Sequence, residues 1–275
     1  MRRMARRAHG WRLPARLIAI LATALACGTL MLIPADGGAT AILPRSGLAA
    51  GRAATASHTG RPFGGVAAVG ALFTMDSGRL GTHFCTASVV HSTRGDLAVT
   101  AAHCVSDDPG QVVFVPGYAN GTEPYGIWQV TRVYTDQAWQ SAQDPDDDVA
   151  FLRLSDGSDG TPIEDITGAE QLGTGWQGST LVQVIGYPNS ADQPVVCANW
   201  TKSFSPTQLE FDCRGYTNGT SGGPLLADVS DGSGQGTVIG VIGGYEQGGD
   251  TPDVSYAPAF GAAVAALYRS AEAGG

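Results

Sequence analysis

The chain has 275 residues and a formal net charge of −9, from 16 basic and 25 acidic side chains. Six of the bases and one of the acids lie in residues 1–41, which leaves 10 bases against 24 acids, a net −14, in the remainder. This balance argues against a nucleic-acid partner, because phosphate contacts need clustered Lys and Arg. It suits a soluble protein that works outside the cell, and we expect a monomer.

Residues 1–41 combine a basic start, an apolar middle and a small-x-small ending. The basic stretch is MRRMARRAHGWRLPAR, the apolar run is LIAILATALACGTLMLIP, and ATA occupies positions 39–41. This order predicts a secretory signal peptide that is cleaved after Ala41. The alternative is a transmembrane anchor, but the run is near the lower length limit for a span and contains Thr, Gly and Cys. We therefore expect a secreted protein with no stable membrane association once the signal is removed.

Residues 42–62 read ILPRSGLAAGRAATASHTGRP and have little apolar periodicity. Their enrichment in Ala, Gly, Arg and Ser predicts a flexible pro-segment or linker. The folded domain is therefore expected to span residues 63–275.

From residue 63 onward, short apolar runs alternate with turn residues. The runs are VAAVGALF, HFCTASVV, LAVTAAHCV, QVVFVPGY, GIWQVTRVYT, DVAFLRL, TLVQVIGYP, QLEFDC and TVIGVIGGY. Many short β-branched segments between Gly, Asp, Pro and Ser clusters predict an all-β sandwich or barrel. A stretch with little strand character near 155–175 indicates two halves, about 63–160 and 170–257, each large enough for its own core.

The end of the chain has a different composition. Residues 258–273, PAFGAAVAALYRSAEA, are rich in good helix formers and place Val264, Leu267 and Tyr268 at helical spacing. They predict a helix over 258–272 that begins at Pro258 and packs on the β-structure.

Four cysteines remain once Cys27 leaves with the signal peptide, and an even count in an exported chain indicates two disulfides. Four cysteines allow three pairings. Sequence proximity favours Cys85–Cys104 and Cys197–Cys213, each closing a loop of about 20 residues and contributing about 3 kcal/mol in the chain-entropy description. Metal ligation by these cysteines is not expected, because no Cys-x-x-Cys spacing occurs.

Ser221 lies in TNGTSGGPLL, a stretch with three glycines and a proline. Such a composition is typical of a surface turn. It also suits a nucleophile around which the backbone needs unusual conformations. A serine hydroxyl needs a base to accept its proton, and the base must be held in one orientation.

Candidates for the base and its partner occur upstream. His103 ends the apolar run LAVTAAHC, beside small alanines and a cysteine, although an isolated His at a strand end is often structural. Asp148 directly precedes the apolar VAFL and should be drawn inward, where a carboxylate needs hydrogen-bond partners. The acidic residues just before it could instead bind calcium, but no EF-hand spacing is present.

TAAHC, DVAFL and GTSGGP, in this order, resemble the His, Asp and Ser motifs of the chymotrypsin-like (trypsin-type) serine peptidases, and small secreted bacterial members most of all. The similarity covers about residues 63–270. It implies two antiparallel six-stranded β-barrels with a C-terminal helix, a polypeptide substrate and no cofactor or metal. It also implies His103, Asp148 and Ser221 as the catalytic triad and the N–H groups of Gly219 and Ser221 as the oxyanion hole.

The chain departs from this family beside the nucleophile. Many relatives carry an Asp there that pairs with a newly released N-terminal amine, whereas this chain has Thr220. No cleavable junction of the usual kind is visible, since RPFGGV has Pro62 after Arg61. Activation through a buried N-terminal amine is therefore not expected.

The substrate pocket is less clearly indicated. Gly215, six residues before the serine, occupies the position where trypsin-like members carry an acid at the pocket base. The segment GVIGGYEQ, residues 240–247, resembles the strand that pairs with substrate, so Gly243, Gly244 and Glu246 are candidate binding residues, although an ordinary core strand would read the same way. Glu246 or Asp253 in the pocket would favour substrates with basic side chains.

Together these features predict a secreted serine endopeptidase. A second hypothesis is a binding or adhesion module on the same scaffold without catalysis, because folds host unrelated functions. An esterase is a third, chemically adjacent to the first.

Overall fold

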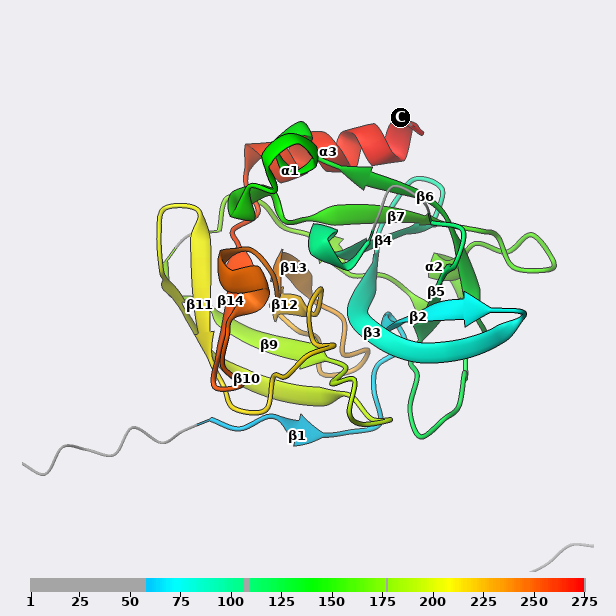
Figure 1. The fold of residues 1–275 in the computed structure, drawn as a ribbon, viewed down its shortest axis with the longest axis horizontal. Helices are drawn as coiled ribbons and strands as arrows, with labels where there is room; N and C mark the ends of the chain where they lie inside the picture. Colours follow the sequence, from blue (N-terminus) through cyan, green and yellow to red (C-terminus); the bar gives the residue numbers. More distant parts are fainter. Residues whose placement is uncertain (1–57, 106–108, 177, 275) are drawn as a thin grey trace, which may run out of the picture. The chain divides into compact units, whose positions relative to one another are not determined.

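Six antiparallel strands of the first half close into a barrel in the computed structural model, which describes residues 58–105, 109–176 and 178–274 (Figure 1). The strands are β2 (Val69–Asp76), β3 (Arg79–Val90), β4 (Leu97–Thr100), β5 (Val112–Pro116), β6 (Trp128–Thr135) and β7 (Ala150–Leu154), in the order β2-β3-β4-β7-β6-β5. Alternate residues of β3, Cys85, Ala87 and Val89, pack with Phe114 and Leu152 in the core of this half. Period-two alternation therefore fills the barrel.

The second half, together with a short strand that precedes the barrel, forms an eight-stranded sheet. Its strands are β1 (Arg61–Pro62), β8 (Gln171–Leu172), β9 (Leu181–Gly186), β10 (Val195–Ser203), β11 (Gln208–Asp212), β12 (Pro224–Ala227), β13 (Thr237–Val241) and β14 (Val254–Pro258). They run in the order β14-β11-β10-β9-β12-β13-β8, with β1 on β10. The expected chymotrypsin-like all-β fold is confirmed. Strands β13 and β14 lie side by side and are joined by main-chain hydrogen bonds from Gly243 N to Tyr256 O and from Phe260 N to Ile239 O, although they form no regular ladder. The short strand β8 extends the β13 edge in parallel, and residues 242–253 turn instead of continuing as a strand.

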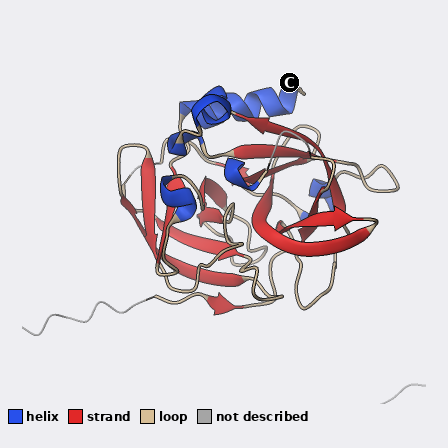
Figure 2. Cartoon of the chain, in the orientation of Figure 1, coloured by secondary structure: helices blue, strands red, loops and turns tan. Residues whose placement is uncertain are grey.

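Helices are few and short beside the strands (Figure 2). They are η1 (Ala102–Cys104), α1 (Gln137–Ala142), η2 (Pro145–Asp147), α2 (Ile163–Thr167), η3 (Tyr245–Gly248) and α3 (Ala262–Ala273). The expected C-terminal helix is present as α3, but it does not begin at Pro258, which pairs with Gln208 at the end of β14. Gly261 is the N-cap instead. No helix among the described residues is long and apolar enough to cross a membrane.

The segment expected as a linker is partly ordered structure. Strand β1 pairs with Val195 and Val196, and Arg214 exchanges main-chain hydrogen bonds with His58 and Gly60. The linker boundary at residue 62 is therefore wrong, because unpaired edge groups of the second sheet bind residues 58–62. The described residues form one compact unit, and the expected signal peptide and the rest of the linker lie outside them.

The two halves pack on each other through a shared apolar cluster. It contains Val69 and Val99 from the barrel strands and Ile185 and Leu226 from the sheet. The helix α3 adds Val264 to the same cluster. The barrel therefore buries residues on its outer face as well as inside, and segments from both halves meet where the candidate catalytic residues lie.

Candidate active site

His103 sits in the single turn η1 directly after β4. The next residue, Cys104, forms a disulfide with Cys85 of β3, with 6.1 Å between the Cα atoms. Cys197 and Cys213 form the second disulfide, so both bonds pair the cysteines that sequence proximity favoured. A disulfide beside His103 restricts where the imidazole can move.

Asp148 is fully buried, with 0% of its surface exposed, and follows η2 directly. Its Oδ1 accepts a hydrogen bond from the main-chain N–H of His103 at 2.8 Å. Its Oδ2 accepts one from the ring Nδ1 of His103 at 2.7 Å and another from the N–H of Gly244 at 2.8 Å. Because a buried carboxylate only accepts, the His103 proton must lie on Nδ1, which leaves Nε2 as an acceptor.

Ser221 lies in the loop between β11 and β12, and the neighbouring glycines are required by space. Gly219 has φ +97°, and a Cβ there would lie 2.5 Å from the N of Asn189. Gly222 has φ +79°, and its Cβ would lie 2.1 Å from the Oγ1 of Thr100. Only glycine combines positive φ with so close an approach of other backbone. The glycines around Ser221 are therefore required by the backbone conformation and close packing of this loop, and not only by a surface turn.

Two peptide groups of this loop are held through their carbonyl oxygens. Asn218 O accepts from Asn189 N at 2.8 Å, and Thr220 O accepts from Gly223 N at 2.9 Å. The N–H groups of those same peptides belong to Gly219 and Ser221. Neither N–H has a hydrogen-bond partner within the described part of the chain. Two oriented and unused donors beside one hydroxyl can stabilise a developing oxyanion.

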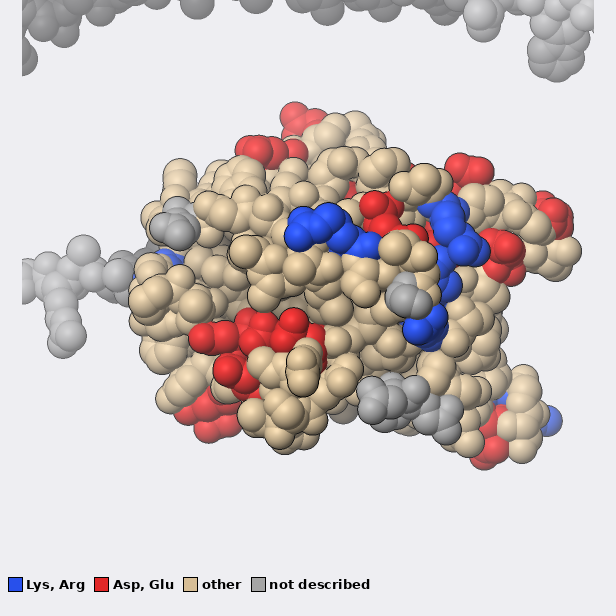
Figure 3. Space-filling view, turned by 90° about the horizontal axis from the view of Figure 1, so that it is seen from above, with Lys and Arg blue, Asp and Glu red and all other residues tan. Residues whose placement is uncertain are grey.

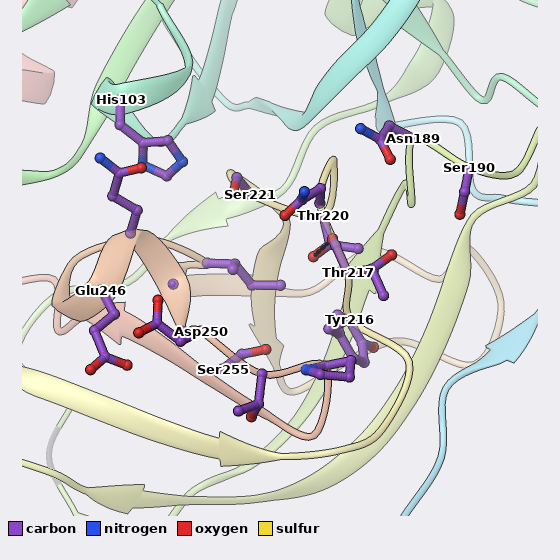
Figure 4. Close-up of a pocket in the computed structure, with 17 residues that line it drawn as sticks. His103, Asn189, Ser190, Tyr216, Thr217, Thr220, Ser221, Glu246, Asp250 and Ser255 are labelled. Carbon is purple, nitrogen blue, oxygen red and sulfur yellow. Dashed lines mark hydrogen bonds between the residues drawn. The ribbon is translucent and has the colours of Figure 1, made fainter.

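His103 and Ser221 line the same cleft, which has a volume of about 560 Å³ (Figure 4). No hydrogen bond joins the Ser221 hydroxyl to the His103 ring among the described residues. Such bonds are often long without substrate and shorten in the reacting complex. The structure therefore brings His103 and Ser221 to one cleft and places the buried Asp148 behind His103; the His–Asp pair is hydrogen-bonded and the Ser–His pair is not.

Of the four expected substrate-binding residues, one lines the cleft and the others lie elsewhere in the structure. Glu246 lines the cleft, whereas Gly215 does not, although its neighbour Tyr216 does. Gly244 donates to Asp148, and a Cβ on Gly243 would lie 2.8 Å from Asp148 Oδ2. These two glycines therefore support the carboxylate.

The segment after β13 is not a continuing strand. Strand β13 ends at Val241, and η3 follows, with Glu246 and Gln247 at φ 50° and 53°. The expectation of an extended substrate-pairing strand is therefore wrong from Tyr245 onward, because these left-handed residues turn the chain.

Acidic groups occur both in the cleft and beside it. Asp250 lines the cleft with Glu246, whereas Asp253 lies outside it and pairs with Arg214 at 3.7 Å. Burial, then repulsion from neighbouring aspartates, raises the pKa of Asp147 next to Asp148. Figure 3 shows one dense group of acidic side chains with no basic side chain beside it, while other acidic side chains on the same face lie next to basic ones. Sequence reasoning missed Asp250, which carries no motif.

The arrangement is that of a chymotrypsin-like serine peptidase, with a β-barrel, a second sheet and a His–Asp pair facing a serine across the cleft. Residues 81–241 match the family of trypsin-like peptidase domains, more than half of the chain, and the chain belongs to that family.

Solved structures share the fold. The protease Anisep from Arthrobacter nicotinovorans matches with a TM-score of 0.66 and 24% identity, over 78% of this chain and 100% of its own. The thermostable serine protease AL20 from an extremophilic microorganism matches at 0.64 and 24%, over 76% and 98%. Human heparin binding protein matches at 0.56 and 16%, over 79% and 96%. A comparison with curated proteins finds no match.

Proposed function

We propose that this protein is a secreted serine endopeptidase in which His103, Asp148 and Ser221 form a catalytic triad. The observation that carries the proposal is the His103–Asp148 pair facing the same cleft as Ser221, whose own N–H and that of Gly219 are donors without a partner among the described residues. Membership of a peptidase family supports a polypeptide substrate.

The first step forms an acyl-enzyme. The Oγ of Ser221 bonds to the scissile carbonyl carbon, its proton passes to Nε2 of His103, and the carbonyl electron pair moves to oxygen. Asp148 holds the ring tautomer and stabilises the imidazolium. When the tetrahedral intermediate collapses, the C–N bond breaks and His103 gives its proton to the leaving amine. Water then repeats the sequence on the ester, which releases the acid and restores Ser221.

The oxyanion of each tetrahedral intermediate lies within reach of the N–H groups of Gly219 and Ser221. Because Asn189 and Gly223 hold the carbonyl ends of those peptides, the donors need no reorganisation when charge develops. Preorganised donors of this kind contribute most when water is excluded, and losing one costs about 100- to 1000-fold in rate.

The cleft beyond the triad favours a cationic substrate side chain. Glu246 and Asp250 are carboxylates on its lining, and Tyr216, Thr217 and Ser255 add polar groups. The described residues of the lining include no Lys or Arg. We infer a preference for peptides with Lys or Arg near the scissile bond, exerted through Asp250 and Glu246.

We also propose that residues 1–41 are a cleaved signal peptide and that residues 42–57 form a pro-segment. The two disulfides fit an oxidising compartment outside the cytoplasm. Mass spectrometry of the protein recovered from culture medium would test the cut after Ala41, and intact protein retained with cells would contradict it.

The function is tested with labelled casein and a fluorophosphonate probe. Wild type should hydrolyse casein and take up one probe per chain at Ser221, and Ser221→Ala should lose both. Ser190→Ala, which changes another serine of the cleft lining, is the matched control and should retain both. Casein hydrolysis that survives Ser221→Ala would overturn the proposal.

The same assay separates the alternatives. An esterase would turn over nitrophenyl esters but not casein. A binding module without catalysis would leave casein intact and the probe unattached. Heparin binding, as in the human structural relative's name, is disfavoured here, because a polyanion would meet the net −14 of residues 42–275.

A further inference from the structure

We propose that Thr86 is a positioning residue for the oxyanion hole, acting through its hydroxyl on the loop that carries Ser221. This inference rests on the proposed function. Thr86 belongs to the barrel strand β3, is 0% exposed, and carries no motif that connects it with catalysis.

The hydroxyl of Thr86 makes two hydrogen bonds across the boundary between the halves, both to residues of the second half. Its Oγ1 donates to the carbonyl oxygen of Gly219 at 3.0 Å and accepts from the N–H of Tyr187 at 2.9 Å. Its main-chain N–H donates to the carbonyl oxygen of Ser221 at 2.7 Å. One barrel residue therefore holds the nucleophile loop at two carbonyls, on either side of Thr220.

The geometry explains why such a restraint matters at Gly219. A glycine at φ +97° has no side chain to limit its rotation, so its two flanking peptides must be held from outside. Asn189 holds the preceding peptide through Asn218 O, and Thr86 holds the following one through Gly219 O. With both held, the Gly219 N–H keeps its direction.

Thr86 also connects this loop with the base. The preceding residue, Cys85, is bonded to Cys104, which directly follows His103. The dipeptide Cys85–Thr86 therefore contacts the chain beside the imidazole through a disulfide and the chain beside the hydroxyl through hydrogen bonds. The carbonyl of Thr86 is in turn held by Thr100 Oγ1 at 2.7 Å. The relative position of base and nucleophile is set across these two residues.

The test compares Thr86→Val, which keeps the shape but removes the hydroxyl, with Thr86→Ser, which keeps the hydroxyl. Thr201→Val is the matched control, because Thr201 is also 0% exposed and its Oγ1 also accepts a main-chain N–H, from Thr180, far from the triad. Each variant is made in the full chain, and kcat and KM are measured on labelled casein.

A second readout is specific for the oxyanion. A peptidyl trifluoromethyl ketone forms a hemiketal: Ser221 Oγ bonds to the ketone carbon, its proton passes to His103, and the carbonyl electron pair moves to the oxygen. The matching peptide amide binds without this step. Inhibition constants of the two compounds therefore separate oxyanion stabilisation from ordinary binding.

We expect Thr86→Val to lower kcat about 10- to 100-fold, less than the outright loss of a donor, with KM nearly unchanged. The inhibition constant of the ketone should rise by the same factor and that of the amide should not. Thr86→Ser should restore both, and Thr201→Val should change thermal stability but neither constant.

Three results would overturn the inference. They are wild-type kcat in folded Thr86→Val, equal losses for ketone and amide, or a folded Thr86→Ser as impaired as Thr86→Val. If Thr86→Val does not fold, Thr86→Ala takes its place under the same criteria. Absence of casein hydrolysis by wild type would instead refute the proposed function and is recognised before any Thr86 variant is compared.

Discussion

His103 and Asp148 are joined twice, because one carboxylate oxygen accepts from the main-chain N–H of His103 and the other accepts from its ring. The first bond places the backbone of the turn η1, and the second orients the imidazole. The fully buried carboxylate therefore fixes both the position and the tautomer of the proposed base, with Gly244 N–H as its third donor.

Replacing Asp148 by Asn should lower kcat on labelled casein by roughly 10³- to 10⁴-fold, with little change in KM. An amide offers one acceptor oxygen to three N–H donors and turns its own NH₂ toward at least one of them. Asp147→Asn, at the adjacent position, is the control and should stay near wild type. Similar kcat values for the two variants would contradict the assigned role.

Gly219→Ala should reduce kcat at least about 100-fold, because its methyl group would meet Asn189 N and Tyr187 O and displace the oxyanion donor. Gly215→Ala is a matched control: its φ is +98°, but no atom of the described residues lies within 4 Å of the added Cβ. Both variants carry the backbone strain of a positive φ, and only Gly219→Ala adds the clash. Equal losses of activity would show that strain alone is responsible.

Asp250→Asn should lower kcat/KM for peptides with Lys or Arg at the cleavage site about 10-fold, which corresponds to loss of one favourable charge interaction. Peptides with neutral residues there should be unaffected. Since Asp250 is exposed, the wild-type preference should weaken as salt is raised. Asp253→Asn, outside the cleft, is the control. If cleavage of a peptide library showed no preference for Lys or Arg at the cleavage site, the role assigned to Asp250 would be wrong.

Glu170 should make stability fall with rising pH. Burial raises its pKa from 4.5 to about 7, although Gly236 N–H donates to one oxygen and opposes the shift. Below pH 4.5 folded and unfolded chains both hold the proton. Between 4.5 and 7 the unfolded chain loses it first, so the free energy of unfolding decreases by up to about 3 kcal/mol and then levels off.

Urea unfolding of wild type and Glu170→Gln between pH 4 and 8 measures this effect. Glutamine does not titrate, so the difference in unfolding free energy between the two proteins should move in favour of the variant as pH rises to about 7. A constant difference across the range would show that Glu170 keeps an ordinary pKa.

Much of the fold could be predicted from patterns of residues that are close together in the sequence. Apolar alternation and turn residues indicated the strands, and cysteine spacing favoured both disulfides that the structure contains. The positions of His103, Asp148 and Ser221 came from three motifs whose local composition is itself demanded by packing. Gly222, for instance, has no room for a side chain. Their catalytic roles stay predictions until the variants are measured.

What could not be predicted depends on contacts between distant segments. Thr86 and Asn189 act on the Ser221 loop from other parts of the chain, and no local pattern distinguishes them from ordinary polar residues. The order in residues 58–62 comes from pairing with β10 and Arg214, which composition does not reveal. Gly243 and Gly244 were assigned to substrate, because sequence position alone does not show that Asp148 lies against them.

Hydrogen bonds connect the helix α3 and the residue after it with two strands of the barrel. Arg153 in β7 donates to the carbonyl oxygen of Ala271, and Arg132 in β6 donates to that of Gly274. Two barrel strands are thus held by a helix that follows them more than 100 residues later in the sequence. During synthesis these arginine contacts form only once α3 has emerged from the ribosome, so the barrel reaches its final set of contacts late.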